Sequence, residues 1–204
     1  KNKLVNKAEL QKQLGLPVDK DIPVIGLVSR LVSQKGLDLI KGVIEEILNL
    51  DMQLVILGTG DQAYEDLFEY YSHIYPKKLS SNIGFSDKLA KLIYAGADMF
   101  LMPSLFEPCG IGQLIALRYG TGPIVRETGG LKDTITPYNK YTGEGNGFSF
   151  TNYNAHDMLD AVVRARAYYD DKMKWGRLVN TALKQDFSWT KSAKDYIALY
   201  NDIH

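Results

Sequence analysis

Short apolar runs alternate with amphipathic stretches along most of the chain, and this alternation restricts the fold more than any other feature. Several runs are apolar almost throughout, which is typical of strands covered on both faces. Strands that alternate with helices predict a parallel, doubly wound, Rossmann-like sheet of the α/β class. The expected strands lie at 23–29, 52–58, 80–85, 98–102, 122–126 and 148–150, and the expected helices at 36–50, 61–75, 87–97, 111–120, 155–170, 171–185 and 186–203.

The charge and cysteine content of the 204 residues exclude several classes of partner. Lys plus Arg and Asp plus Glu both number 24, so the net charge is zero, which argues against a nucleic acid or a membrane surface. The chain has one cysteine and three histidines without metal-ligand spacing, so we expect no disulfide and no metal site. This cysteine content favours the cytoplasm.

The stretch "SRLVSQKG" follows the first expected strand, at the sheet edge where ligands of parallel sheets bind. Arg30 ends this strand and Lys35 begins the next helix, where a cation is unfavourable by a few tenths of a kcal/mol. Two cations beside free N–H groups indicate an anion site. The alternative is two solvated surface charges.

The stretch "PSLFEPCGIGQL" follows the fourth expected strand and reaches the same edge. Gly110 and Gly112 leave backbone N–H groups bare where the next helix begins, which predicts a second anion site. Glu107 is a poor anion ligand but a good acceptor for hydroxyl groups, so the combination fits a sugar phosphate. Alternatively, Glu107 caps the helix and Cys109 is a small buried hydrophobic residue.

Two further glycine-containing loops lie at this edge. Gly58, Gly60 and Ala63 match a dinucleotide-binding pattern, but they follow the second strand instead of the first, so a tight turn is favoured and a dehydrogenase is the weakest hypothesis. In "IGFSD", Gly84 bares the backbone and Phe85 offers a flat face to a base or a sugar. Packing of Phe85 over the rim of the core is the alternative.

Five stretches resemble, in order, the C-terminal half of bacterial glycogen synthases and plant starch synthases: "SRLVSQKGLDL", "LGTGD", "YAGADMFLMPSLFEPCGIGQL", "ALRYGTGPIVRETGGLKDT" and "DFSWTKSA". The resemblance covers essentially the whole chain. It implies one half of a GT-B fold, with a donor-binding domain at 1–185. It also implies that the C-terminal helix at 186–204 crosses back to an N-terminal domain that this chain lacks.

The resemblance also implies a reaction and a set of site residues. Glucose passes from ADP-glucose, or UDP-glucose in some relatives, to the non-reducing end of an α-1,4-glucan with retention, without a metal or cofactor. Arg30 and Lys35 would neutralise the leaving diphosphate, and Glu107 would bind the sugar. The nucleotide-sugar contacts would fall on Gly84, Phe85, Cys109, Gly110, Ile111 and Gly112.

Three positions bear on the branch of the family. Phe85 and Gly112 stand where the family usually has tyrosine and threonine, so two hydroxyl groups are lost. Ile115 stands where related sucrose and mannose transferases carry a second glutamate, which favours the glycogen-synthase branch.

Two other hypotheses about the function stay open. One is another retaining transferase with a different nucleotide sugar, and the other is a non-catalytic module that binds a nucleotide or a glucan. The module has no need for a sugar-orienting Glu107. Because the acceptor surface belongs to the missing half, we expect no transferase activity from this chain alone.

Overall fold

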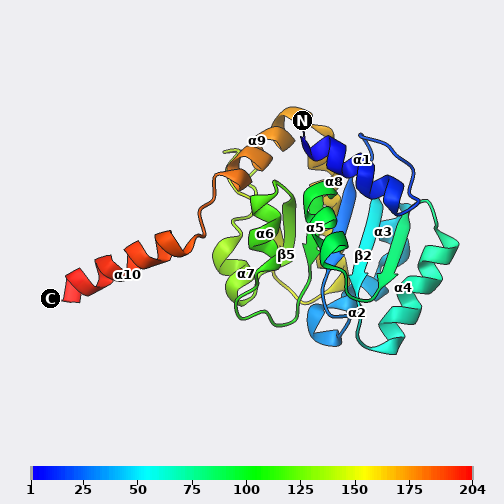
Figure 1. Cartoon of the computed structure of the whole chain (residues 1–204), viewed down its shortest axis with the longest axis horizontal. Helices are drawn as coiled ribbons and strands as arrows, with labels where there is room; N and C mark the ends of the chain where they lie inside the picture. The colour runs from blue at the N-terminus through cyan, green and yellow to red at the C-terminus, as the bar shows by residue number, and fades with distance from the viewer. Residues whose placement is uncertain (1, 204) are drawn as a thin grey trace.

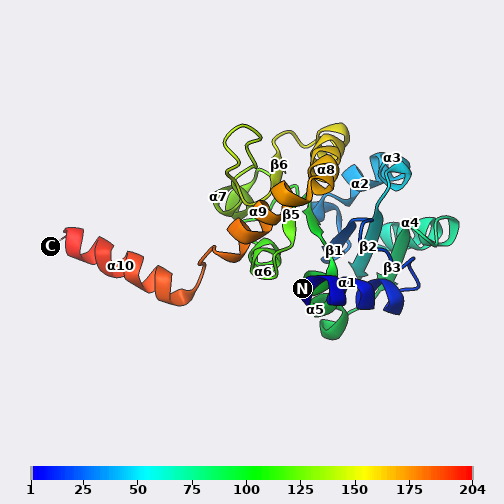
Figure 2. The same ribbon diagram turned by 90° about the horizontal axis from the view of Figure 1, so that it is seen from above.

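A six-stranded, all-parallel sheet lies at the centre of the computed structural model, which describes residues 2–203 (Figures 1 and 2). The strand order is β3-β2-β1-β4-β5-β6, which confirms the predicted doubly wound sheet. Each expected strand is present, with bounds that differ from the expected ones by at most two residues. The strands are β1 (Val24–Val28), β2 (Gln53–Gly58), β3 (Leu79–Ile83), β4 (Met99–Met102), β5 (Gly122–Arg126) and β6 (Phe148–Phe150).

Helices cover both faces of this sheet. Alternate residues of β2 separate the two layers, since Leu54 and Ile56 belong to one apolar cluster and Val55 and Leu57 to the other. The first cluster includes residues of α2, α3, α4 and α8, and the second includes residues of α1, α5 and α6. The helices are α1 (Asn2–Gln13), η1 (Ser33–Lys35, a 3₁₀ turn), α2 (Leu37–Gly42), α3 (Ile44–Asn49), α4 (Gln62–Ile74), α5 (Asp87–Gly96), α6 (Gly112–Arg118), α7 (Gly129–Thr134), α8 (Ala155–Asp170), α9 (Lys172–Leu183) and α10 (Trp189–Ile203).

The prediction of a single helix at 36–50 is wrong, because this segment forms two shorter helices, α2 and α3. The break falls at Val43, whose φ of −140° and ψ of 24° are not helical. The preceding Gly42 is a weak helix former, and a Cβ there would lie 3.2 Å from the Cβ of Ala155. The chain therefore leaves the helical path at a point where α8 lies close to it.

The first helix, α1, was not predicted from the sequence, because its buried face is mostly polar. Lys7 and Gln11 are each 1% exposed. The Lys7 ammonium lies 2.8 Å from the Asp98 carboxylate, which also accepts the backbone N–H of Val24 at 2.9 Å. This buried pair fastens α1 to the start of β1 and β4.

The last helix, α10, lies where the sequence predicted it. Ser188 Oγ accepts the backbone N–H of Lys191 at 3.3 Å, as expected for a capping residue. None of the residues of α10 is buried, and Figures 1 and 2 show the helix extending away from the body of the molecule. Trp189 is 91% exposed.

Among residues 2–203, the structure contains no helix with the length and apolarity that a membrane crossing requires.

The buried ion pair makes a prediction about stability. Lys7→Met should lower the free energy of unfolding by about 3–5 kcal/mol, because it leaves the Asp98 carboxylate buried without its counterion. The double variant Lys7→Met/Asp98→Asn should recover part of this loss. Urea unfolding measures both.

The matched control is Lys91→Met, which removes a pair that is 67% exposed on each side and should therefore change the free energy of unfolding very little. Equal losses for the Lys7 and Lys91 variants would contradict the assigned role of the buried pair.

Candidate functional site

The candidate site lies beyond β1 and β4, where the order of strands reverses. The connection from β1 leads to β2 on one side, and the connection from β4 leads to β5 on the other. Loops at such a switch point diverge and leave a crevice at the carboxyl ends of the strands. The two loops here are residues 29–36 and 103–111.

The two loops are joined at one end of the crevice. The backbone N–H of Leu105 donates to the carbonyl oxygen of Gln34 at 2.9 Å, and the Gln34 side chain donates to the carbonyl oxygen of Phe106 at 3.2 Å. Gly36 has a φ of +75°, and a Cβ there would lie 2.1 Å from the carbonyl oxygen of Pro103. Glycine is therefore required at this contact.

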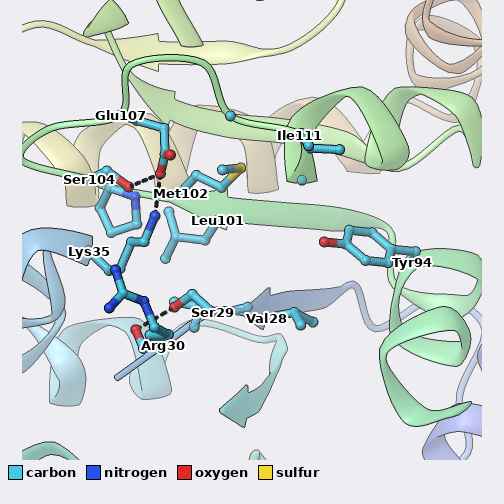
Figure 3. A pocket seen from close by; sticks show the side chains of 14 residues that line it. Val28, Ser29, Arg30, Lys35, Tyr94, Leu101, Met102, Ser104, Glu107 and Ile111 are labelled. Atoms are coloured by element: carbon cyan, nitrogen blue, oxygen red, sulfur yellow. Dashed lines mark hydrogen bonds and ion pairs between the residues drawn. The ribbon is translucent and has the colours of Figure 1, made fainter. Parts of the chain in front are cut away.

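A cavity of about 260 Å³ lies between these loops and contains an ion pair (Figure 3). Lys35 Nζ lies 2.6 Å from Glu107 Oε2, and Ser104 Oγ donates to the same oxygen at 3.2 Å. The side chains of Lys35 and Glu107 are only 20% and 12% exposed. Glu107 accepts from these two groups and does not cap α6, so the capping alternative is wrong. Of the predicted site residues, the cavity is lined by Arg30, Lys35, Glu107, Gly110, Ile111 and Gly112.

Arg30 differs from Lys35 in its surroundings. Its side chain is exposed, and within residues 2–203 its guanidinium has no hydrogen-bond or ion-pair partner. The surface-charge alternative thus fits the exposure of Arg30 but not that of Lys35.

A second pocket, of about 270 Å³, adjoins the first and shares Arg30 with it. Gly84, with a φ of +137°, and Phe85 contribute to its wall. Phe85 is 93% exposed, so the alternative that it packs over the rim of the core is wrong. Its aromatic face is available to a planar ligand.

The backbone carbonyl groups of residues 107–110 are held by hydrogen-bond donors from α6 and α7. The N–H of Gly130, in α7, donates to the carbonyl oxygens of Glu107 and Pro108 at 3.2 and 3.1 Å. The fully buried Gln113 donates from Nε2 to the carbonyl oxygens of Cys109 and Gly110 at 3.2 and 3.0 Å. Four consecutive carbonyl groups are thus held inside the fold.

The N–H groups of residues 109–112 have no partner within the described part of the chain. The Cys109 side chain is exposed, so the buried-hydrophobe alternative is wrong. Cys109 contributes to neither pocket wall as the structure describes them. Its predicted role in nucleotide-sugar binding stays a prediction.

Sequence reasoning missed the residues that support or complete the cavity. Ser104 is 2% exposed, and Arg126 Nε donates to its carbonyl oxygen at 2.8 Å. Tyr94 lies in the cavity wall, although its helical spacing indicates only a core residue. Polar residues inside apolar surroundings, such as Gln113, were the available signal. No group of His, Cys, Asp and Glu in residues 2–203 has the arrangement of a metal site.

Comparison with known proteins places the chain in a family. Residues 6–177 match the family described as Glycosyl transferases group 1. The chain belongs to this family of glycosyltransferases. The glycogen synthase of Clostridium acetobutylicum is 63% identical over 203 residues, and that of Bacillus anthracis is 57% identical over 198. These alignments cover 99% and 97% of this glycosyltransferase chain but only 43% and 42% of the relatives.

A solved structure supports the same family and the GT-B fold. The catalytic domain of starch synthase IV from Arabidopsis thaliana, bound to ADP and acarbose, superposes with a TM-score of 0.88 at 38% identity. The match covers 98% of this glycosyltransferase chain and 42% of that structure. The sheet described above thus corresponds to one half of a longer glycosyltransferase.

The anchoring of the loop makes a prediction about stability and local motion. Gln113→Leu should lower the free energy of unfolding by roughly 1–3 kcal/mol, because the carbonyl groups of Cys109 and Gly110 lose their donor inside the fold. Hydrogen exchange of the amides at 107–112 should accelerate. Urea unfolding and exchange mass spectrometry measure the two effects.

The control is Gln62→Leu, which changes an exposed glutamine of α4 and should alter neither quantity. Unchanged exchange at 107–112 in the Gln113 variant would show that this side chain does not hold the loop.

Proposed function

We propose that the cavity binds the sugar-diphosphate part of ADP-glucose and that the chain is the donor-binding domain of a glycogen or starch synthase. The observation that carries the proposal is the Lys35–Glu107 pair, held in a cavity that Arg30 and residues 110–112, with their bare N–H groups, also line. The high identity to glycogen synthases supports the choice of reaction.

The charges of the cavity suit the different parts of such a donor. Lys35, Arg30 and the N–H groups of 110–112 supply positive charge and hydrogen-bond donors for a diphosphate. Glu107 supplies an acceptor for the hydroxyl groups of the sugar. Phe85, beside Arg30 in the adjoining pocket, offers its face to the base.

The same groups fit transfer with retention. The bond between the glucose C1 and the diphosphate oxygen breaks, and the acceptor hydroxyl oxygen bonds to C1 from the same face. The proton of the acceptor passes to the leaving phosphate. Preorganised cations and N–H groups act most strongly on the charge that develops on this phosphate. Glu107 is the one carboxylate of the cavity wall described here, whereas glycoside hydrolases use two.

The domain division and the remaining partners follow from the same proposal. Residues 1–185 bind the donor, and the helix at 186–204 crosses to an N-terminal domain that supplies the α-1,4-glucan site. Two facts support this. The exposed α10 carries Trp189, Tyr196 and Tyr200 without cover among the described residues, and the relatives are more than twice as long as this chain.

Nucleotide titration tests the donor site. We expect ADP to bind this chain more tightly than UDP in calorimetry. Arg30→Ala and Lys35→Ala should each weaken ADP by roughly 10- to 100-fold, because a hydrogen bond to a charged group contributes about 1.5–3 kcal/mol. Arg30→Ala is the cleaner variant, since this side chain has no partner in residues 2–203.

The matched control is Lys41→Ala, an exposed lysine of α2, which should leave ADP binding unchanged. Preferential binding of UDP would contradict the ADP-glucose assignment. Equal binding of ADP by the Arg30, Lys35 and Lys41 variants would contradict the location of the site.

Transferase assays test the domain proposal. The purified chain, given ADP-glucose and glycogen, should transfer no measurable glucose because the acceptor surface lies in the other domain. A full-length protein that contains this domain should be active in the same assay and should lose activity on Glu107→Ala. Turnover by the isolated chain would contradict the proposal.

A further inference from the structure

Tyr94 stands in the cavity wall across from Lys35 and Glu107 (Figure 3). It belongs to α5, and its ring packs on Phe100 with 4.7 Å between ring centroids. The residue is only 9% exposed. Figure 3 shows its hydroxyl end directed into the cavity while the ring stays in the wall.

The Tyr94 hydroxyl has no hydrogen-bond partner within residues 2–203, so it is free to bond to a ligand or to solvent. Tyr71, Tyr153 and Tyr169 each donate their hydroxyl to an oxygen of the fold. A tyrosine hydroxyl in a largely buried position normally has such a partner. Burial raises the pKa of Tyr94 to about 12, so the group stays protonated and is available as a donor at neutral pH.

Gly112 leaves the approach to this hydroxyl open. A Cβ at position 112 would lie 3.3 Å from the hydroxyl oxygen of Tyr94 and equally close to Met102 Sδ. The hydroxyl therefore lies close to Gly112, whose N–H has no partner within residues 2–203. This end of the cavity presents hydrogen-bond donors, whereas the acceptor Glu107 lies at the other end.

We propose that the Tyr94 hydroxyl donates a hydrogen bond to a phosphate oxygen of the bound nucleoside diphosphate sugar. This inference rests on the proposed function and adds to it a donor-binding residue. A phosphate oxygen is the fitting partner because it only accepts, and the groups around it at this end only donate. A sugar hydroxyl, which needs an acceptor as well, is better placed near Glu107.

The test is Tyr94→Phe, which removes the hydroxyl and keeps the ring on Phe100. By calorimetry, the variant should bind ADP and ADP-glucose about tenfold more weakly than the unchanged chain, by the same factor for both ligands. Its unfolding temperature should stay close to that of the unchanged chain.

Tyr168→Phe is the matched control, since it removes a tyrosine hydroxyl that does not line the cavity, on α8 against Tyr138 and Trp175. This variant should bind ADP with unchanged affinity. Equal weakening by both variants would assign the effect to lost packing and overturn the inference.

Two other results would also overturn it. Unchanged ADP affinity in the Tyr94 variant would show that the hydroxyl contacts no phosphate, and a loss confined to ADP-glucose would place it against the sugar. Failure of the unchanged chain to bind ADP would be a different result, because it would overturn the proposed function together with this inference.

Discussion

The handedness of the parallel crossovers is the constraint on which the site depends. Connections between parallel strands are right-handed, so the helices after β1 and β4 cover opposite faces of the sheet. The loops that lead to these helices must therefore diverge, and a crevice forms between them independently of the side chains that the loops carry. Arg30 and Lys35 approach it from one loop and Glu107 from the other.

The polar groups beneath the loop keep this crevice in shape. Gly130 and Gln113 bind the carbonyl oxygens of residues 107–110, so the adjoining N–H groups are left to the cavity. These carbonyl groups resist movement, because each one that loses its donor inside the fold costs about 1–3 kcal/mol. The donors are thus positioned before any ligand arrives, which lowers the entropy lost on binding.

The strands were predictable because the spacing of apolar residues is a local property of the sequence. The grouping of Arg30, Lys35 and Glu107 was predictable because the carboxyl ends of parallel strands lie at the same edge of the sheet. The helix α1 was not, since its buried face depends on Lys7 meeting Asp98, a residue 91 positions away. Other features depend on where the loop backbones lie to within a few ångströms: the Lys35–Glu107 pair, the role of Gln113 and the orientation of Tyr94. No pattern in the sequence encodes such distances directly.

If the cavity binds a sugar diphosphate, as proposed, the Lys35–Glu107 pair makes its capture an exchange of partners at Lys35. Glu107 already neutralises Lys35, so an arriving group must compete with a carboxylate 2.6 Å away. An uncharged sugar has no charge with which to compete, whereas a diphosphate offers more negative charge than the carboxylate it displaces. Once displaced, Glu107 is free to turn toward hydroxyl groups. On the proposed function, one ion pair would therefore set a threshold of ligand charge and link recognition of the phosphate to recognition of the sugar.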